Sequence, residues 1–408
     1  MSKLPKGWEK KTLNDISELT SSKRIYLSDY VEKGVPFFRG KEISQLKKNE
    51  KVEDILYISE EKYEEIKQKF GIPVKNDILI TAVGTLANTY RIPNNDKFYF
   101  KDGNLIWLKN ISEYSIYVEY SLNFNKKLLL DSAIGSSQKA LTIAELKKIE
   151  LAFPPIEEQK KIADILSTVD KKIAFVEENI NATEELKKGL MQKLLTEGIG
   201  HTEFKDSELG RIPESWEVVQ FDKVCDIRDG THDSPKYIES GIPFITSKHL
   251  TDNGIDFTET NYISKENHIE FSKRSKVDNG DILFGMIGTI GKPIIVNTDF
   301  EFSIKNIALL KLSCNELLSN IYVLNLLKSN IITKQFSKLS NGGVQSFIAL
   351  GMIRKLKIPL PPLEEQKQIA EILSTVDNKL ENLKEKKLFF EELKKGLMQK
   401  LLTGEVRI

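Results

Sequence analysis

The sequence predicts an α+β protein in which two globular α+β domains are separated by two long, repeated helices that form an antiparallel coiled coil. A stretch that starts at Pro154 recurs without gaps from Pro361, and roughly two-thirds of the aligned residues are identical. Apolar residues in both copies follow heptad spacing, which is typical of paired helices. Outside the copies, strand-like and helix-like runs alternate, which favours the α+β class for both domains.

Residues 1–153 are predicted to form the first domain. The runs IPVKNDILITA and FYFKDGNLIWL indicate strands, because β-branched and aromatic residues lie between turn-forming residues. The run SIYVEYSLNF indicates a short helix before the first repeat. Mixed strands and helices in one segment are expected to fold around one core.

Residues 154–200 are predicted to form the first long helix. Pro154 and Pro155 end the preceding strand, and Glu157 and Glu158 favour a helix that begins there, because carboxylates stabilise a helix N-terminus. The heptads run as far as Thr183 and an apolar face then resumes, so one continuous helix or two helices with a break would satisfy the pattern. The expected seam residues are Ile162, Leu166, Val169, Ile173, Val176 and Ile180.

Residues 201–360 and 361–408 are predicted to repeat this plan as a second domain and a second long helix. Short anchors recur in the same order, GVPF with GIPF and NDILITAVGT with NGDILFGMIGT, while the residues between the anchors are almost unrelated. We therefore expect one scaffold that carries two different binding surfaces. The second seam is expected at Ile369, Leu373, Val376, Leu380 and Leu383.

The long helices have two interpretations. A helix of about 38 residues spans roughly 57 Å, which could hold two domains apart. Two such seams in one chain favour antiparallel pairing of the copies. The alternative is a bundle that merely completes the core of each domain.

Composition bounds the class of protein. With 408 residues the chain can bury more than one core, and neither a secretion signal nor a membrane-spanning stretch is visible, so we expect a cytoplasmic protein without a membrane partner. Cys225 and Cys314 lie far apart, without the spacing of a zinc site or a disulfide framework. The net charge of +1 argues neither for nor against nucleic acid, so a prediction of DNA binding must rest on local groups.

Motifs of catalysis are absent from the sequence. It contains no GxxxxGK[ST] phosphate loop, no HExxH and no GxSxG, and its four histidines are scattered. The lack of these motifs is consistent with a chain that is not an enzyme and that binds no cofactor or metal of its own.

The order of these parts resembles one family. The segments PPIEEQKKIADILSTVDKKI and PPLEEQKQIAEILSTVDNKL, each after a strand-like LAF or IPL and a variable domain, resemble the specificity subunit of type I restriction-modification systems. The resemblance covers nearly the whole chain. It implies two target-recognition domains that each read one half of a bipartite asymmetric DNA sequence.

The same resemblance implies the partners. The repeated helices would set the gap between the half-sites and dock two modification subunits, which are adenine methyltransferases. Restriction subunits, which are ATP-dependent translocases and nucleases, would join through them to act on double-stranded DNA. S-adenosylmethionine, ATP and Mg are accordingly expected on partner subunits only.

Candidate DNA contacts lie in loops at matched positions of the two domains. Lys and Arg supply affinity through phosphates, while amides and other polar groups read base edges. In the first domain the candidates are Lys23, Arg24, Arg39, Lys41, Lys101, Asn104, Gln138 and Lys139. In the second domain they are Arg228, Thr231, His232, Lys236, Ser247, Lys248, His249, Lys305, Asn306, Asn341, Gln345 and Ser346.

Each candidate also has a simpler interpretation. A surface lysine is usually solvated, and Asn beside Gly forms turns. Aromatic residues near these loops, such as Phe37, Phe38 and Phe244, are better explained as a sheet core. The run KKGLMQK could be a solvated helix face or, because both copies retain it, a partner-docking surface.

Two other functions stay open at this point. The chain could be an interaction scaffold whose variable domains bind proteins. It could also be an enzyme that cuts or methylates DNA by itself. Salt-sensitive binding to one split DNA sequence would separate DNA recognition from the scaffold, because phosphate neutralisation makes DNA affinity fall steeply with salt.

Overall fold

The computed structural model describes residues 4–48, 50–135, 139–252, 254–287, 291–313, 315–339 and 347–408. The chain divides into two compact units. Unit 1 comprises Met1–Glu177 and Glu385–Ile408, and unit 2 comprises Glu178–Lys384. Each unit contains one variable domain and part of both long helices, so the compact units divide both helices whereas the domain boundaries predicted from the sequence lie at the helix ends.

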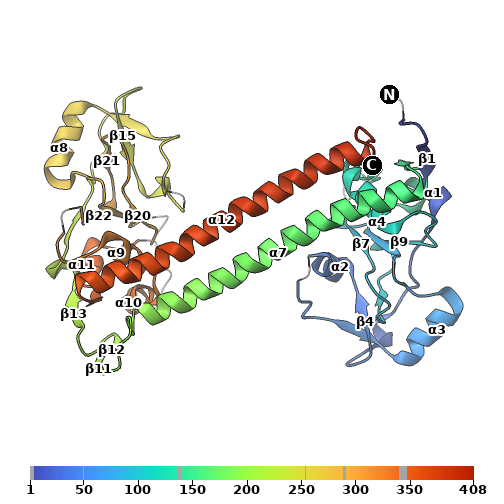
Figure 1. The fold of residues 1–408 in the computed structure, drawn as a ribbon, viewed down its shortest axis with the longest axis horizontal. Coiled ribbons are helices and arrows are strands. Elements are labelled where there is room, and N and C mark those ends of the chain that lie inside the picture. The colour runs from blue at the N-terminus through green and yellow to red at the C-terminus, as the bar shows by residue number, and fades with distance from the viewer. Residues whose placement is uncertain are drawn as a thin grey trace. The chain divides into compact units, whose positions relative to one another are not determined.

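Unit 1 alternates short strands with short helices (Figure 1). In chain order its elements are β1 (Glu9–Thr12), α1 (Leu13–Ile16), β2 (Glu18–Thr20), the 3-10 helix η1 (Leu27–Asp29), β3 (Tyr30–Val31), β4 (Val35–Phe38), α2 (Gly40–Lys47), β5 (Leu56–Ile58), α3 (Glu60–Phe70), β6 (Ile78–Thr81), β7 (Thr89–Arg91), β8 (Tyr99–Phe100), β9 (Leu105–Lys109), α4 (Ser115–Phe124), α5 (Lys126–Asp131), α6 (Ile143–Leu146), β10 (Glu150–Phe153) and the first part of α7 (Ile156–Leu194).

Two four-stranded sheets form the frame of unit 1. One has the antiparallel order β2-β9-β6-β7, and the other has the order β3-β5-β4-β8 with β4 and β8 parallel. In β6, Ile78 and Ile80 pack into one apolar cluster and Leu79 into another, because successive side chains of a strand point to opposite faces. Burial on both faces explains why the run ILIT is apolar without interruption.

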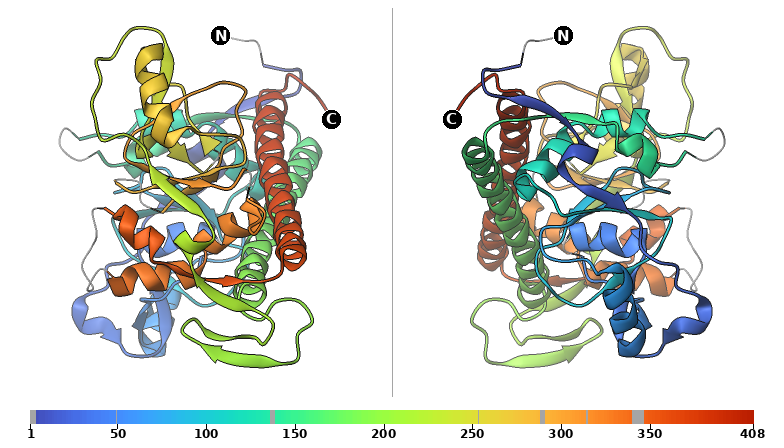
Figure 2. Two further views of the ribbon diagram at one scale, coloured as in Figure 1. Left: turned by 90° about the vertical axis from the view of Figure 1, so that its left-hand side faces the viewer. Right: turned by 90° about the vertical axis from the view of Figure 1, so that its right-hand side faces the viewer.

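Unit 2 repeats most of this order (Figure 2). It adds the β11–β12 and β16–β17 hairpins, and it has an isolated bridge between Ile238 and Tyr262 in place of β3 and the 3-10 helix η3 in place of α2. Its elements are β11 (Phe204–Ser207), β12 (Gly210–Pro213), β13 (Glu217–Gln220), the 3-10 helix η2 (Phe221–Lys223), β14 (Asp226–Asp229), β15 (Ile242–Ile245), the 3-10 helix η3 (Ser247–His249), β16 (Leu250–Thr251), β17 (Gly254–Ile255), β18 (Asn261–Ile263), α8 (Lys265–Ser275), β19 (Ile282–Gly285), β20 (Pro293–Ile295), β21 (Ser303–Ile304), β22 (Ile307–Lys311), α9 (Asn320–Leu327), α10 (Asn330–Leu339), α11 (Leu350–Arg354), β23 (Lys357–Leu360) and the first part of α12 (Leu363–Leu402).

The sheets of unit 2 match those of unit 1. The order β14-β22-β19-β20 corresponds to β2-β9-β6-β7, and β18-β15-β21 keeps a parallel pair between β15 and β21. Ile282 and Phe284 of β19 pack into one cluster while Leu283 packs into another. The α+β class and the shared scaffold predicted from the anchors are therefore confirmed. The aromatic residues Phe37 and Phe244 are buried in the sheets, as the simpler interpretation of them predicted.

Each long helix is one unbroken helix, which decides between the two possibilities that the sequence left open (Figure 1). Most of the predicted seam is buried, and Ile173, Val376 and Leu383 are half-buried. The buried seam residues are Ile162, Leu166, Val169, Val176, Ile180, Ile369, Leu373 and Leu380.

Ion pairs establish the direction of helix pairing in each unit. In unit 1, Asp170 of α7 lies 2.6 Å from Lys394 of α12, and Glu177 lies 2.9 Å from Lys387. Residue numbers rise along α7 as they fall along α12, so the helices are antiparallel. In unit 2, Lys187 and Asp377 make the equivalent contact at 2.5 Å, so the predicted antiparallel coiled coil is confirmed within each unit.

The helix ends also belong to the domain cores. In unit 1, Ile162 and Leu166 share a cluster with Leu401 and with the domain residue Tyr117. In unit 2, Ile369 and Leu373 share a cluster with Leu194 and the domain core. Within each unit the helices therefore pair with each other and also complete the core of the domain.

The glutamine of the repeated PP[IL]EEQ motif fastens each domain to its helix. In unit 1, buried Gln159 donates from Nε2 to the Pro154 carbonyl at 2.8 Å and to Glu113 Oε2 at 2.7 Å, and its Oε1 accepts from the Tyr114 amide at 3.0 Å. This side chain therefore joins the helix start to the segment before α4. A glutamine has the two donors and one acceptor oxygen that the position needs.

Gln366 does the same in unit 2. It donates to the carbonyls of Pro361 and Leu317, each at 2.9 Å, and accepts from the Ser319 amide at 3.0 Å.

Among the described residues, no helix is both long and apolar enough to span a membrane.

Candidate nucleic-acid interface

The candidate loops gather at one end of the four-stranded sheet in each unit. In unit 1, β2 ends, β9 begins, β6 ends and β7 begins at this end, as the register Thr81 with Leu105 and Ile80 with Thr89 shows. In unit 2, Asp229 opposite Ala308 and Gly285 opposite Ile307 give the same arrangement. Antiparallel pairing therefore brings together loops that are far apart in the sequence.

Three of the unit 1 loops contact one another. The Gly103 amide donates to Ser21 Oγ at 3.3 Å, and Arg24 Nε donates to Asp102 Oδ2 at 3.0 Å. The Lys101 amide donates to the Phe38 carbonyl at 2.9 Å, which extends the parallel β4–β8 pair. The loops after β2, after β4 and before β9 thus form one surface.

The basic side chains of that surface differ in how they are held. Arg39 makes a bidentate contact with buried Glu42, with Nη2 to Oε1 at 2.6 Å, so its guanidinium is fixed at the start of α2. The Lys23 ammonium lies 4.4 Å from the centre of the Phe70 ring. Lys41, Lys101 and Lys139 are exposed, whereas Asn104 is half-buried.

Backbone contacts also join three loops in unit 2. The Thr231 amide donates to the Ile304 carbonyl at 3.1 Å, and the Lys305 amide donates to the Ile245 carbonyl at 2.8 Å. Ser247 Oγ donates to the Asn306 carbonyl at 3.4 Å. The loops after β14, β15 and β21 therefore meet as their counterparts do in unit 1.

A polar network fixes side chains in this part of unit 2. His232 Nε2 lies 2.9 Å from Asp229 Oδ2, and Nδ1 lies 2.6 Å from Asn306 Oδ1. The buried Asp229 carboxylate also binds Arg274 of α8, and Lys305 donates to Ser234 Oγ. Two oxygen atoms flank the imidazole, so both ring nitrogens have a hydrogen-bond partner.

Asn306 lies at the centre of this network. It has a φ of 52°, in the left-handed region that Asn tolerates better than most residues. Its side-chain amide combines donors with an acceptor, the pattern that pairs with adenine. Arg274 and Asp229 were not among the predicted contacts. The pair Asp229-Gly230 suggests a turn in the sequence, but Asp229 is the last residue of β14, and Arg274 lies on α8, away from the predicted loops.

Other candidates of the second domain lie in different surroundings. Lys236 and Lys248 are exposed, while Arg228 binds Asp226 with Nε to Oδ2 at 2.8 Å. Ser247 and His249 are buried. His249 Nδ1 accepts from the Thr246 amide at 2.9 Å and Nε2 lies 3.2 Å from the Glu259 carbonyl, so both nitrogens are engaged inside the domain.

Burial lowers the pKa of His249, because desolvation penalises the charged ring. A neutral, fully engaged imidazole caps the turn and has no group left for a base edge. Lys248 beside it is the better candidate for a contact. Gln138, Asn341, Gln345 and Ser346 lie outside the described residues.

The described residues gather no three His, Cys, Asp or Glu side chains that could hold a metal. Cys225 is buried in unit 2, and desolvation raises its pKa to about 12, which keeps the thiol protonated. What the loop surfaces offer is a set of cations, amides and hydroxyls. Such groups can bind phosphates and base edges.

Comparison with known proteins agrees with this chemistry. Residues 5–185 and 213–389 match the family described as Type I restriction modification DNA specificity domain. The chain is 31% identical over 368 residues to the type I restriction enzyme MjaVIII specificity subunit of Methanocaldococcus jannaschii, covering 85% of this chain and 83% of that protein. It is also 31% identical over 423 residues to the putative type I restriction enzyme MjaX specificity subunit of the same organism, covering 99% and 95%.

Solved structures share the fold. A type I restriction-modification S subunit from M. genitalium has a TM-score of 0.59 at 17% identity, with 98% of each chain covered. A chain from a structural study of assembly and conformational transition of the type I R-M system has a TM-score of 0.60 at 18% identity, with 100% of each chain covered. At these identities the likeness concerns the fold alone.

Proposed function

Because the chain belongs to the family of type I restriction-modification specificity subunits, we propose that it is the DNA-recognition subunit of such a complex and has no catalytic activity of its own. Each variable domain reads one half of a bipartite, asymmetric target in double-stranded DNA. The observation that carries this proposal is the matched placement of the candidate loops: the same sheet end presents Arg24 and Lys101 in one unit and His232, Lys305 and Asn306 in the other.

The loops at these ends differ in chemistry, which suits two different half-sites. Unit 1 offers mainly cations, whereas unit 2 offers an amide held by an imidazole. A base edge in the major groove is distinguished by its pattern of donors and acceptors. Two unlike patterns on one scaffold would therefore read an asymmetric sequence.

We further propose that α7 and α12 set the distance between the half-sites and dock two modification subunits. In support, several residues are identical in the two copies and exposed in both, although exposed helix positions tolerate most substitutions. These pairs include Glu157 and Glu364, Lys160 and Lys367, Ile165 and Ile372, Thr168 and Thr375, Lys172 and Lys379, Leu186 and Leu393, Lys188 and Lys395, Gly189 and Gly396, Gln192 and Gln399, and Lys193 and Lys400.

The glycines are the most informative members of this set. A Cβ built on Gly189 or Gly396 would meet nothing within 4 Å. Glycine inside a helix costs about 1 kcal/mol relative to alanine. Retention of an unfavourable residue that internal packing does not need supports close approach of another protein at that point, twice per chain.

Restriction subunits would join through the modification subunits. S-adenosylmethionine, ATP and Mg would bind those partners, and the assembled complex would act in the cytoplasm. Under this proposal, replacing Gly189 and Gly396 together by leucine abolishes capture of the modification subunit. The control, Ala182→Leu, places the same side chain at an exposed position that differs between the copies, and it should leave capture intact.

The direct test is to express the chain with the modification subunit of its own locus in a host that lacks adenine methylation, and to map methylated adenines across the genome. The expected result is methylation confined to one split, asymmetric sequence, and its absence when either protein is omitted. A stable complex without sequence-specific methylation would favour the scaffold instead. Methylation or cleavage by the isolated chain would favour an enzyme.

A further inference from the structure

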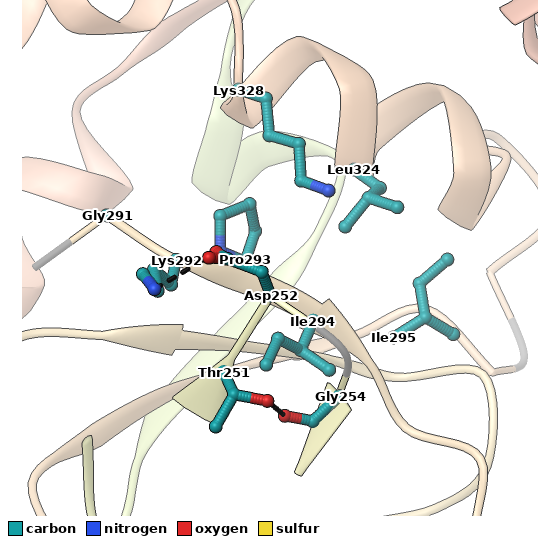
Figure 3. A pocket seen from close by; sticks show the side chains of 10 residues that line it. All are labelled: Thr251, Asp252, Gly254, Gly291, Lys292, Pro293, Ile294, Ile295, Leu324 and Lys328. Carbon is teal, nitrogen blue, oxygen red and sulfur yellow. Dashed lines mark hydrogen bonds and ion pairs between the residues drawn. The ribbon is translucent and has the colours of Figure 1, made fainter. Parts of the chain in front are cut away.

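A pocket in unit 2 lies beside the sheet end that carries the candidate loops. It has a volume of about 430 Å³ and lies between the β16–β17 hairpin, β20 and the C-terminal end of α9. Its wall combines apolar Ile294, Ile295 and Leu324 with two lysines, Lys292 and Lys328 (Figure 3). Thr251 and Asp252 also line the pocket, so its wall is polar as well as apolar. Two ammonium groups against one carboxylate suit an anion.

Lys328 is the cation that this pocket leaves unbalanced. Its side chain extends into the pocket from the end of α9 (Figure 3). Among the described residues no hydrogen bond or ion pair holds its ammonium. Partial desolvation, followed by the nearby positive charge of Lys187, lowers the pKa of Lys328, while Asp377 and Asp252 act in the opposite direction. A bound anion would relieve that desolvation.

The other charges around the pocket are already paired. Lys292 Nζ lies 3.0 Å from the Asp252 carboxylate, which is largely exposed, and Lys187 lies 2.5 Å from Asp377. These three cations and two carboxylates sum to one positive charge. Because exposed pairs contribute little, Lys292 can exchange Asp252 for another anion at small cost.

Unit 1 carries two lysines beside β7, the strand that corresponds to β20. They come from other elements than the lysines of unit 2. Lys47, at the end of α2, donates to Thr89 Oγ1 at 3.3 Å and to Asn123 Oδ1 at 3.1 Å. Lys126, at the start of α5, donates to Asn88 Oδ1 at 2.9 Å. All three acceptors are neutral, and in the part of unit 1 that the structure describes no carboxylate pairs with either lysine.

The same helix pair flanks both clusters. Partial desolvation lowers the pKa of Lys47, and the nearby Glu119 carboxylate opposes this shift. Weaker effects come from Lys126 and from two residues of the long helices, Lys394 and Asp170. These two residues occupy, in the two helix copies, the positions of Lys187 and Asp377 beside Lys328. The two clusters are therefore equivalent in place although their lysines are not equivalent in sequence.

Sheet order relates each cluster to the candidate loops. β7 and β20, beside the lysines, are edge strands, and β2 and β14, followed by the loops, are the opposite edges of the same sheets. Three strand spacings of about 4.8 Å give a separation of about 14 Å. A ligand that contacts both must be an extended polyanion, as a DNA strand is.

We infer that Lys292 with Lys328 in unit 2, and Lys47 with Lys126 in unit 1, each bind a phosphodiester group of the DNA backbone beside the bases that the loops read. This inference rests on the proposed function and adds to it a contact that carries no sequence information. Phosphate contacts position a protein on the duplex. Two domains that read different bases can therefore share this contact while differing in their loops.

The test measures DNA affinity against salt concentration for the chain assembled with its modification subunit. Replacing Lys292 and Lys328 together by glutamine should lower affinity several-fold, equally for the target and for a duplex with a mutated half-site. It should reduce the slope of log K against log salt by about 0.9 for each phosphate that the variant no longer neutralises. Lys47→Gln with Lys126→Gln should do the same.

A matched control is Lys223→Gln, which removes an exposed lysine at the opposite end of the β14 strand. It should leave the slope unchanged. Asp252→Asn should instead raise the affinity for DNA, because it removes the carboxylate that pairs with Lys292. Circular dichroism and melting temperature establish that each variant is folded.

Several results would overturn the inference. They are an unchanged slope in both double variants, a loss confined to the target duplex, or a loss of modification-subunit binding with DNA affinity intact. Protection of Lys328 from acetylation by inorganic phosphate but not by DNA, at equal ionic strength, would assign the pocket to a free anion and also overturn it. If the wild-type complex bound no DNA specifically, the proposed function itself would fail, which is a distinguishable outcome.

Discussion

The two variable domains agree where they hold the helices and differ where their loops face outward. Tyr117 donates to the Ala152 carbonyl at 2.8 Å, and Tyr322 donates to the Pro359 carbonyl at 3.1 Å. At the loop surface, by contrast, Arg24 binds Asp102, whereas unit 2 has a network of several side chains. Residues that fix the scaffold tolerate little change, and loops that carry no scaffold contact are free to change.

Glu42 and His249 show that a difference in residue type between the domains need not be a difference in function. Glu42 and His249 follow the matched GVPF and GIPF anchors at the same distance, and each accepts the backbone amide of the residue three before it, Arg39 or Thr246. Both side chains therefore cap a helical turn. A histidine beside a lysine suggests a DNA contact in the sequence, but its counterpart shows that the position is a capping position.

The largest effect is expected from removal of the Asn306 side chain, which belongs to the loop network of unit 2. Asn306→Gly keeps the left-handed backbone and removes the amide. Removal of one bidentate base contact costs about 1–3 kcal/mol of discrimination, so methylation at the target should fall roughly 5- to 150-fold, with sequences mutated in the second half-site less affected. Sequencing of methylated adenines measures it. An equal loss on all sequences would mean that Asn306 does not contact a base.

The next prediction concerns the shared scaffold. Gln159→Ala and Gln366→Ala each leave a backbone amide without its acceptor and two acceptor oxygens without their donor, so each should reduce the free energy of unfolding by about 2–3 kcal/mol. The losses should be similar, because the hydrogen bonds are. Urea unfolding measures them, with exposed Gln192→Ala as a control expected within about 0.5 kcal/mol of wild type. Unequal losses would contradict the equivalence of the two anchors.

A tryptophan pair tests a place where the scaffolds diverge. Trp216 donates from Nε1 to Glu365 Oε2 at 2.9 Å, whereas the buried Nε1 of Trp8 has no acceptor within the described residues. Trp216→Phe should therefore cost about 1–2 kcal/mol more than Trp8→Phe, since only the former breaks a charge-assisted hydrogen bond. Urea midpoints compare the two variants. Equal costs would mean that Trp8 finds a partner in solution.

The smallest expected effect is a difference in pH response at the capping positions. Because burial lowers the pKa of His249, its stabilisation is complete above the ordinary histidine pKa of 6.5 and is lost as pH falls towards the folded-state pKa. Burial opposes ionisation of Glu42, but hydrogen bonds from Arg39 hold its pKa below 4.5. Its stabilisation is thus lost only at lower pH.

Between about pH 6.5 and pH 5, unit 2 should therefore become less stable, by about 1 kcal/mol at most, while unit 1 does not. Hydrogen exchange of amides in η3 and α2 at several pH values measures this. His249→Gln should abolish the pH response of η3. A response of equal size in α2 would contradict the prediction.

Much of the fold could be predicted from patterns that occur twice in the sequence. The heptads predicted paired helices and the anchors predicted a common scaffold, because burial of an apolar face constrains spacing directly. Less of the candidate site could be predicted from the sequence. Arg274 and Asp229 act through contacts between residues distant in the sequence, and the lysine clusters draw on helices and strands whose order in the sheet no local pattern reveals.

The sequence by itself determined the duplicated architecture and the seam, since repetition and periodicity are properties of the chain. Only the tertiary structure decided which loops meet. In that structure the His249 side chain is buried and bonds the Thr246 amide, and His232 bonds the side chain of Asn306. The Lys328 ammonium has no ion pair among the described residues. The physical reason is that hydrogen bonds and desolvation depend on neighbours in space, and antiparallel strands bring together residues that the sequence keeps far apart.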